Sequence, residues 1–213
     1  MNPYNIINFI ASKIPEKYSK EKIYKISNLL PIPIDNAYED ENGKQGKWKI
    51  KKSIYTFKNN IKNGPFEIYN KENVLTEKGH FNNGVKDGEF EKYHRNGKIQ
   101  VKYFIENQQL NGHLLVYDEK GNLIEKTNYK DGQKNGEDIS YFTNGKIQKI
   151  THYINDKVNG PFETYHTNGQ LYIKCMVKND NVDGIRYVYD ENGSLKGKLL
   201  YDNGILKEKL PIN

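Results

Sequence analysis

The sequence predicts an all-β repeat array: an elongated, single-layer antiparallel meander of β-hairpins, preceded by a short α-helical cap. Two observations lead to this prediction. Six tyrosines recur every 24 residues, and a glycine stands five positions before each of them, without insertion or deletion. Such a strict period indicates one supersecondary unit that stacks on its neighbours. The tyrosines are Tyr69, Tyr93, Tyr117, Tyr141, Tyr165 and Tyr189, and the glycines are Gly64, Gly88, Gly112, Gly136, Gly160 and Gly184.

The second copy shows why the unit should be a hairpin. Residues 88–93 and 99–105 are two short runs of strand-forming residues, joined by a loop that contains Asn96-Gly97. A three-residue hairpin loop usually places its third residue at positive φ, which glycine and asparagine tolerate best. This loop would place Tyr93 opposite Ile99. The third loop position holds Asn73, Gly97, Gly121, Gly145, Gly169 and Gly193 in the six copies.

That pairing assigns side chains to the two faces of the sheet. The tyrosines and their Leu or Ile partners would form one apolar stripe, which we interpret as the structural core. Counting by twos extends this stripe to Phe81, Ile105, Tyr129, Tyr153, Val177 and Tyr201. The opposite face would pair Phe66 with Lys78, Phe90 with Lys102, Leu114 with Lys126, Asp138 with Ile150, Phe162 with Lys174 and Arg186 with Lys198.

These lysine and aromatic pairs have two interpretations. They could form a cation–π ribbon for an acidic or anionic partner. Alternatively, the lysine stems simply cover phenylalanine rings on a solvated face.

Residues 1–37 are out of phase with the array and are predicted to form the helical cap. One helix would start at Asn2-Pro3, because proline is favoured in a first helical turn, and a second would run from Ser19 to Leu30. These helices would cover the first edge of the sheet. A docking arm for a partner is the alternative.

The array itself is assigned to residues 38–213. It would begin with a shortened copy at about 42–63, in which Trp48 to Phe57 form a clipped hairpin. Full copies would start at residues 64, 88, 112, 136, 160 and 184. A last strand is predicted over 205–210, where charged residues and the following proline would blunt the open edge.

Composition narrows the classes of partner. Hydrophobic residues make up 35% of the 213 residues, which is low for a chain with one thick core, and the net charge is +6. Only Arg95 and Arg186 among the 33 basic residues are arginine, whereas specific nucleic-acid recognition favours the guanidinium group. Nucleic acid is therefore not an expected partner. The single cysteine, Cys175, permits no intramolecular disulfide, and we find no signal peptide or membrane-spanning run, so a cytoplasmic location is expected.

No pattern in the sequence indicates a catalytic residue, a cofactor or a metal site. His94 and His166 occupy equivalent positions three copies apart, which would separate them by roughly 29 Å. Glu67 and Glu91 would lie about 10 Å apart, a separation that formally suits an inverting carboxylate pair. An exposed sheet face would give that pair neither a cleft nor different pKa values. The sequence therefore predicts a protein that is not an enzyme.

The unit Gly-x-Phe-Glu-x-Tyr-x-x-Asn-Gly-x-Leu, seen at 88–99 and 160–171, resembles the bacterial variant of the MORN repeat. Tandem copies at this period are similar to the YwqK-type antitoxin family, over about residues 42–205. The resemblance implies an antitoxin or immunity partner of a toxin, and MORN repeats more widely imply scaffolding and phospholipid contact. The matching positions are scaffold positions, so no binding residue is transferred. Asp138 and Ser140 depart from the pattern and predict a polar gap midway along the sheet.

We therefore expect a non-enzymatic protein-binding module, an antitoxin or immunity protein that neutralises a toxin or effector with one face of its sheet. The alternative is a scaffold on an anionic lipid surface that uses the lysine and aromatic pairs. This alternative stays open because a chain of charge +6 is electrostatically mismatched to a basic toxin. The candidate partner-binding residues are Phe66, Lys78, Phe90, Lys102, Phe104, Leu114, Lys126, Phe162, Lys174, Met176, Arg186, Lys198 and Leu200.

Overall fold

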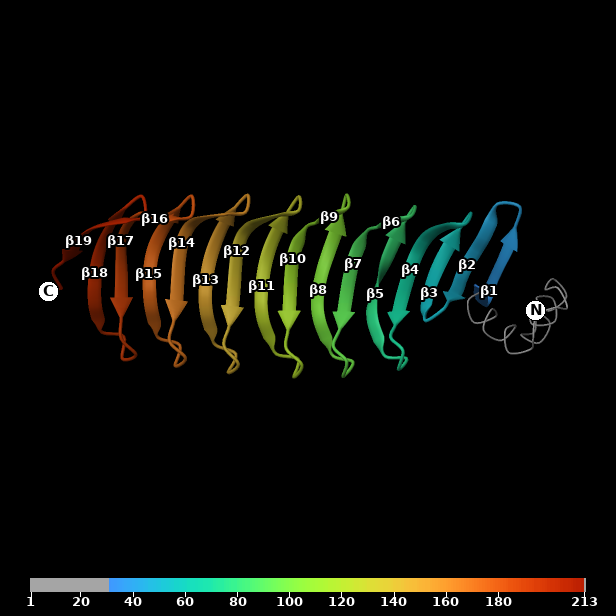
Figure 1. Cartoon of the computed structure of the whole chain (residues 1–213), viewed down its shortest axis with the longest axis horizontal. Helices are drawn as coiled ribbons and strands as arrows, with labels where there is room; N and C mark the ends of the chain where they lie inside the picture. The colour runs from blue at the N-terminus through green and yellow to red at the C-terminus, as the bar shows by residue number, and fades with distance from the viewer. Residues whose placement is uncertain (1–30, 213) are drawn as a thin grey trace, which may run out of the picture. The chain divides into compact units, whose positions relative to one another are not determined.

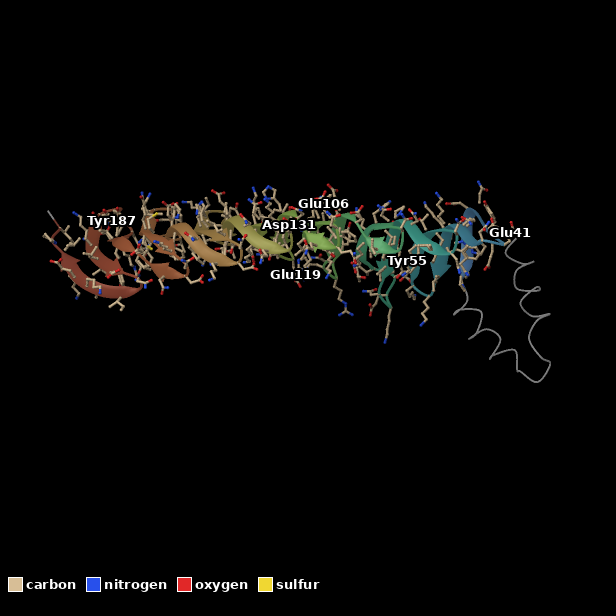
Figure 2. The ribbon with its side chains drawn as sticks, turned by 90° about the horizontal axis from the view of Figure 1, so that it is seen from above. Glu41, Tyr55, Glu106, Glu119, Asp131 and Tyr187 are labelled. Atoms are coloured by element: carbon tan, nitrogen blue, oxygen red, sulfur yellow. The ribbon has the colours of Figure 1, made fainter. Side chains whose placement is uncertain are left out.

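The computed structural model describes residues 31–212, and every regular element in that range is a β-strand. The chain divides into two compact units, which comprise residues 31–85 and 86–212 of the described range. In each unit the strands follow one another in sequence order and pair antiparallel (Figure 1). Each unit is a single layer with side chains on both faces (Figure 2). The predicted all-β meander of hairpins is confirmed.

The first unit starts earlier than predicted. Its first strand begins at Ile32, inside the predicted cap 1–37, whereas the two predicted helices lie outside the described residues. The clipped hairpin is confirmed, with Trp48 paired to Tyr55. The strands are β1 (Ile32–Asp40), β2 (Gly43–Ile50), β3 (Ser53–Lys58), β4 (Ile61–Tyr69) and β5 (Leu75–Asn82), and β6 (Val85–Lys86) follows at the boundary.

The second unit contains the copies that start at residues 88, 112, 136, 160 and 184, and it ends with the predicted last strand. Its strands are β7 (Gly88–Tyr93), β8 (Ile99–Glu106), β9 (Gln109–Leu110), β10 (Gly112–Tyr117), β11 (Leu123–Lys130), β12 (Gln133–Tyr141), β13 (Ile147–Ile154), β14 (Lys157–Tyr165), β15 (Leu171–Lys178), β16 (Asn181–Val182), β17 (Gly184–Tyr189), β18 (Leu195–Asp202) and β19 (Ile205–Leu210). None of the described residues forms a helix that is long and apolar enough to cross a membrane.

The hairpin loops have the predicted geometry. In the second copy the amide of Gly97 donates to the carbonyl of His94, and the amide of His94 donates to the carbonyl of Lys98. Tyr93 pairs with Ile99, as expected. All six residues at the third loop position have positive φ, including Asn73 at 63°.

A β-bulge beside each loop overturns the predicted cross-strand pairs. Tyr93 pairs with Ile99, but Lys92 pairs with Val101, so Gln100 is an extra residue. One extra residue moves every side chain beyond it to the other face. The predicted pairs of aromatic and lysine residues are therefore wrong. The observed pairs are Phe66 with Gly79, Phe90 with Tyr103, Leu114 with Thr127, Asp138 with Thr151, Phe162 with Cys175 and Arg186 with Leu199.

The bulge also reverses the predicted core. In each unit we call the face that carries Phe66 or Phe90 and their equivalents the buried face, and the other the outer face. Phe66 and Phe90 are only 2% and 1% exposed. Phe81 joins this face, with its ring 4.9 Å from that of Phe66, so the predicted stripe from the tyrosines to Phe81 and its equivalents is broken. The core therefore lies on the face that the sequence assigned to a partner.

Consecutive copies are joined by two-residue turns in which both residues have positive φ, the type I′ geometry that matches strand twist. In the second unit Asp131-Gly132 is one such turn. Most of these turns also bond to the strand that follows the preceding turn: the Gly132 amide donates to the Leu110 carbonyl at 2.9 Å. At the loop edge, His94 Nε2 lies 2.8 Å from the Tyr117 carbonyl oxygen. Bonds at both edges thus hold successive copies in register.

Candidate functional site

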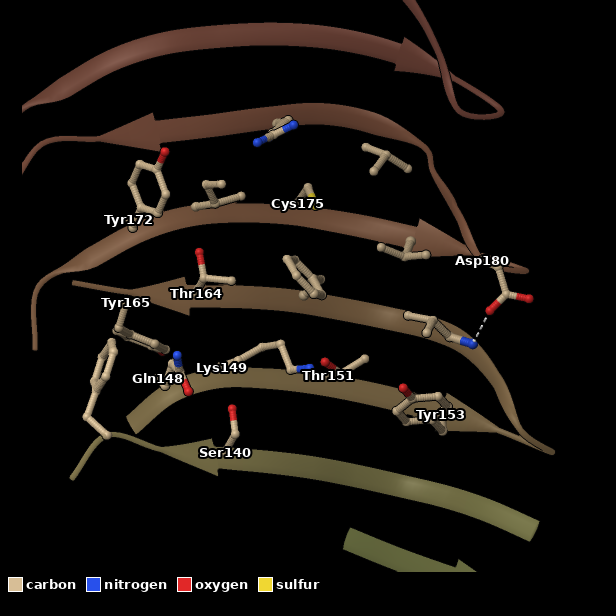
Figure 3. Close-up of a pocket in the computed structure, with 17 residues that line it drawn as sticks. Ser140, Gln148, Lys149, Thr151, Tyr153, Thr164, Tyr165, Tyr172, Cys175 and Asp180 are labelled. Carbon is tan, nitrogen blue, oxygen red and sulfur yellow. Dashed lines mark hydrogen bonds between the residues drawn. The ribbon is translucent and has the colours of Figure 1, made fainter. Parts of the chain in front are cut away.

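A groove of about 770 Å³ lies on the buried face of the second unit, over β12–β17 (Figure 3). Its floor is one layer of side chains, because alternate residues of each strand point to the same face. The lining residues are Ser140, Phe142, Gln148, Lys149, Thr151, Tyr153, Val158, Phe162, Thr164, Tyr165, Tyr172, Ile173, Cys175, Val177, Asp180, Val182 and Arg186.

A central row crosses the groove from strand to strand. Thr151 on β13 pairs with Phe162 on β14, which pairs with Cys175 on β15. Arg186 on β17 comes next, one position beyond the Lys174–Tyr187 pair. The row therefore runs from a hydroxyl through an apolar middle to a guanidinium group.

Three buried polar atoms in this groove lack a hydrogen-bond partner among the described residues: Thr151 Oγ1, Thr164 Oγ1 and Arg186 Nε. Thr151 is only 2% exposed. Figure 3 shows Thr151 and Thr164 on the floor of the groove. Folded proteins bond nearly all buried polar groups, so three such atoms in one groove are an exception to the rule.

The groove is positively charged along its floor. Lys149 and Arg186 make no ion pair within residues 31–212. Asp180 lies at the edge formed by the turns, where its Oδ1 accepts a hydrogen bond of 2.8 Å from the Val158 amide (Figure 3). Burial raises the pKa of the Cys175 thiol, against a smaller opposing effect of Arg186. That thiol is thus protonated at neutral pH and is a poor nucleophile.

The polar gap predicted at Asp138 is filled by a bonded network. Asp138 is buried, and it accepts hydrogen bonds from Thr127 Oγ1 at 3.2 Å and from Lys134 Nζ at 3.1 Å. Lys134 also lies 5.0 Å from the centre of the Tyr153 ring. This acid is therefore neutralised inside the sheet, unlike the two cations of the groove.

Cation–π contacts exist on the buried face, but they involve lysines that the sequence analysis did not select. Lys62 Nζ lies 3.8 Å from the centre of the Tyr55 ring, and Lys86 Nζ lies 5.2 Å from that of Phe90. With Lys134 these residues share one position of the 24-residue period. The 24-residue spacing of these lysines is the sequence signal that could have identified them.

On the outer face, the constant spacing of the copies builds a repeated Glu–Tyr–Lys group. In the fifth full copy, Glu163 accepts a hydrogen bond of 2.6 Å from Tyr165 and an ion pair of 2.9 Å from Lys174. The Tyr165 hydroxyl and Lys174 together lower the pKa of Glu163. Burial, with the hydrogen bond to Glu163, raises the pKa of Tyr165 to about 12. Glu91 binds Tyr93 and Lys102 in the same way.

These groups change the interpretation of the outer-face glutamates and lysines. Lys102 and Lys174 neutralise glutamates and do not lie over phenylalanine. Glu67 and Glu91 fall in different units, and Glu67 accepts a hydrogen bond of 2.5 Å from Tyr69. In the described part of the chain, no three His, Cys, Asp or Glu side chains gather as metal ligands. His94 and His166 instead lie against the carbonyls of Tyr117 and Tyr189.

The predicted partner-binding residues do not form one surface. The buried face carries Phe66, Phe90, Leu114, Phe162 and Arg186, whereas the outer face carries Lys78, Lys102, Phe104, Lys126, Lys174, Met176, Lys198 and Leu200. Among these, Phe104 and Met176 are well exposed, at 39% and 52%. Phe162 and Arg186 lie in the groove, but sequence reasoning missed Lys149, Thr151 and Thr164, which occupy positions without a fixed residue type.

A family model described as MORN repeat variant matches five segments of the chain, which together cover just over half of it: residues 86–107, 110–131, 134–155, 158–179 and 182–203. The chain belongs to the MORN repeat variant family. Each matched segment contains one hairpin loop and ends at a type I′ turn. A search of curated proteins gave no match.

Within the MORN repeat variant copies, the groove positions vary while the loop and turn positions hold. The position of Arg186 holds Phe66, Phe90, Leu114, Asp138 and Phe162 in the other copies, and that of Lys149 holds Glu77, Val101, Glu125, Ile173 and Gly197. Outer-face positions vary as well: the position of Phe104 holds His80, Asn128, His152, Met176 and Leu200 in the other copies, so variation by itself does not select the binding face.

Proposed function

We propose that this protein is a non-enzymatic binding module that holds a segment of a partner protein in the groove over β12–β17. The observation that carries the proposal is the set of three unpartnered buried polar atoms, all in that groove. An unsatisfied buried donor or acceptor costs about 1–3 kcal/mol. A ligand that bonds to them would recover this free energy.

A protein segment fits the lining better than a small apolar ligand. The floor combines apolar side chains, such as Phe162, Ile173 and Val177, with hydroxyl and cationic donors. Protein interfaces have this mixture of an apolar centre and polar groups that fix orientation. The protonated thiol of Cys175 favours binding instead of covalent catalysis.

We further propose that the partner is a toxin or effector, and that the chain neutralises it in the cytoplasm as an antitoxin or immunity protein. The support is the resemblance of the repeat unit to the YwqK-type antitoxins, together with variable groove residues on a constant scaffold. The rival function, a scaffold on anionic lipid, has less support, because Lys102 and Lys174 are already in ion pairs. Co-sedimentation with anionic vesicles at low salt tests that rival.

A groove-filling variant tests the proposal. Thr164→Trp would occupy the groove, and Lys126→Trp places the same side chain on the outer face as a matched control. The wild-type chain and the control are expected to capture a partner that Thr164→Trp does not, with circular dichroism showing that all three are folded. Capture by Thr164→Trp and loss by Lys126→Trp would place the binding surface on the outer face instead.

A further inference from the structure

The charges of the groove indicate which kind of protein segment it would bind. Arg186 is the one cation at a position that elsewhere holds Phe, Leu or Asp. Its Nε is buried without a hydrogen-bond partner. A buried guanidinium donor needs an acceptor, and an ionised oxygen is the strongest one available.

Lys149 supplies a second, separate positive charge. It stands on β13, and Arg186 stands on β17, with β14 and β15 between them. Three strand spacings of about 4.8 Å separate the two strands by about 14 Å. Lys149 lies level with Val188, two residues along β17 from Arg186, so the two backbone positions are about 16 Å apart on an oblique line. One phosphate group needs donors that converge within hydrogen-bond distance of its oxygens, so these two cations suit two single carboxylates.

The spacing of residues four apart along an extended chain is close to the separation of the two cations. An extended chain advances about 3.4 Å per residue, and residues at even separations point to the same side. Positions i and i+4 are therefore about 14 Å apart on one side. Position i+2 would then lie over the middle of the groove, between the row of Phe162 and Cys175 and the row of Thr164 and Ile173. Asp180, at the turn edge of the groove, disfavours a further acid there.

We infer that the groove selects an extended acidic segment, with Asp or Glu at two positions four residues apart, one on Arg186 and one on Lys149, and an apolar residue midway. This inference rests on the proposed function. The hydroxyls of Thr151 and Thr164 bond to the polar groups of the same segment. The partner is thus an acidic protein segment, which matches the chain's own net charge of +6.

A displayed library of random nine-residue peptides tests the inference without a known partner. It is selected against the full-length wild-type chain and against Arg186→Met, Lys149→Met and the outer-face control Lys126→Met, which removes the same charge. Wild type and control should enrich peptides with two acids four residues apart. Each groove variant should lose the preference at one position and bind the selected peptide about tenfold or more weakly. Arg186→Lys keeps the charge and therefore tests whether the charge matters. Melting followed by circular dichroism shows whether each variant is still folded.

The outcomes distinguish the two proposals. Peptides that Thr164→Trp excludes, but that show no acidic preference, would overturn the acidic segment and leave groove binding standing. Acidic peptides that bind Arg186→Met and Lys149→Met as tightly as wild type would also overturn it. If no peptide depends on the groove, so that Thr164→Trp binds whatever wild type binds, both proposals fail.

Discussion

Phe90→Ala tests the assignment of the core to the buried face. Phe90 is 1% exposed, its ring stacks on Tyr103 with centroids 5.3 Å apart, and Lys86 Nζ lies 5.2 Å from its centre. Truncating a buried phenylalanine costs about 3–5 kcal/mol, of which the lost stacking accounts for about 1 kcal/mol. We expect the free energy of unfolding to fall by about 4 kcal/mol.

Phe104→Ala is the matched control, because Phe104 belongs to the same hairpin but lies on the outer face and is 39% exposed. Its truncation should cost under about 1 kcal/mol. Urea unfolding followed by far-ultraviolet circular dichroism measures both. With a slope of about 2 kcal/mol per molar urea, the midpoint should fall by about 2 M for Phe90→Ala and by less than about 0.5 M for the control. Equal shifts would refute the face assignment.

Three further predictions concern the repeat itself. Gly160→Ala should destabilise the chain more than Gly88→Ala in urea unfolding, since φ is positive at both but an added Cβ at 160 would lie 3.0 Å from His152 Cβ, whereas at 88 it meets open space. Tyr165→Phe should lower the free energy of unfolding by about 1 kcal/mol at neutral pH. The pKa of Tyr165 in the folded protein is raised to about 12, so this difference from wild type should be present below pH 10 and vanish as pH rises from 10 to 12. Asp138→Leu should lower the free energy of unfolding by about 2 kcal/mol, because it leaves Lys134 unpaired. Adding Lys134→Leu should restore most of this stability in thermal melting, since Leu110 and Leu114 occupy the two positions in the previous copy. A double variant no more stable than the single one would contradict the pairing.

The sequence contained enough to predict the hairpins, because turn chemistry is local. The three-residue loops are predicted from Asn-Gly pairs such as Asn96-Gly97, and Gly97 has the expected positive φ in the structure. The same reasoning applied to Asp131-Gly132 and Asn203-Gly204 would have found the type I′ turns, since these pairs are the strongest short hairpin signal.

The bulge could not be predicted from residue type. The extra residue is Thr76, Gln100, Ile124, Gln148, Tyr172 or Lys196 in successive copies. A bulged residue in ordinary right-handed geometry requires no particular side chain. Counting by twos across it therefore exchanged the two faces. The available clue was electrostatic: Glu91 and Glu163 can meet Lys102 and Lys174 only if one residue is skipped.

Asp138 and Arg186 show why the proposed binding groove lies in one part of the array. They occupy the same position of the repeat, two copies apart, and both bring a charge to the buried face. Asp138 has Thr127 and Lys134 beside it. The equivalent neighbours of Arg186 are Cys175 and Val182, which supply no acceptor for its Nε. Because the loops, bulges and turns are common to both copies, this difference does not arise from the backbone. The charge of Asp138 is satisfied within the protein, whereas Nε of Arg186 has no acceptor among the described residues, and the proposed acidic segment would supply one.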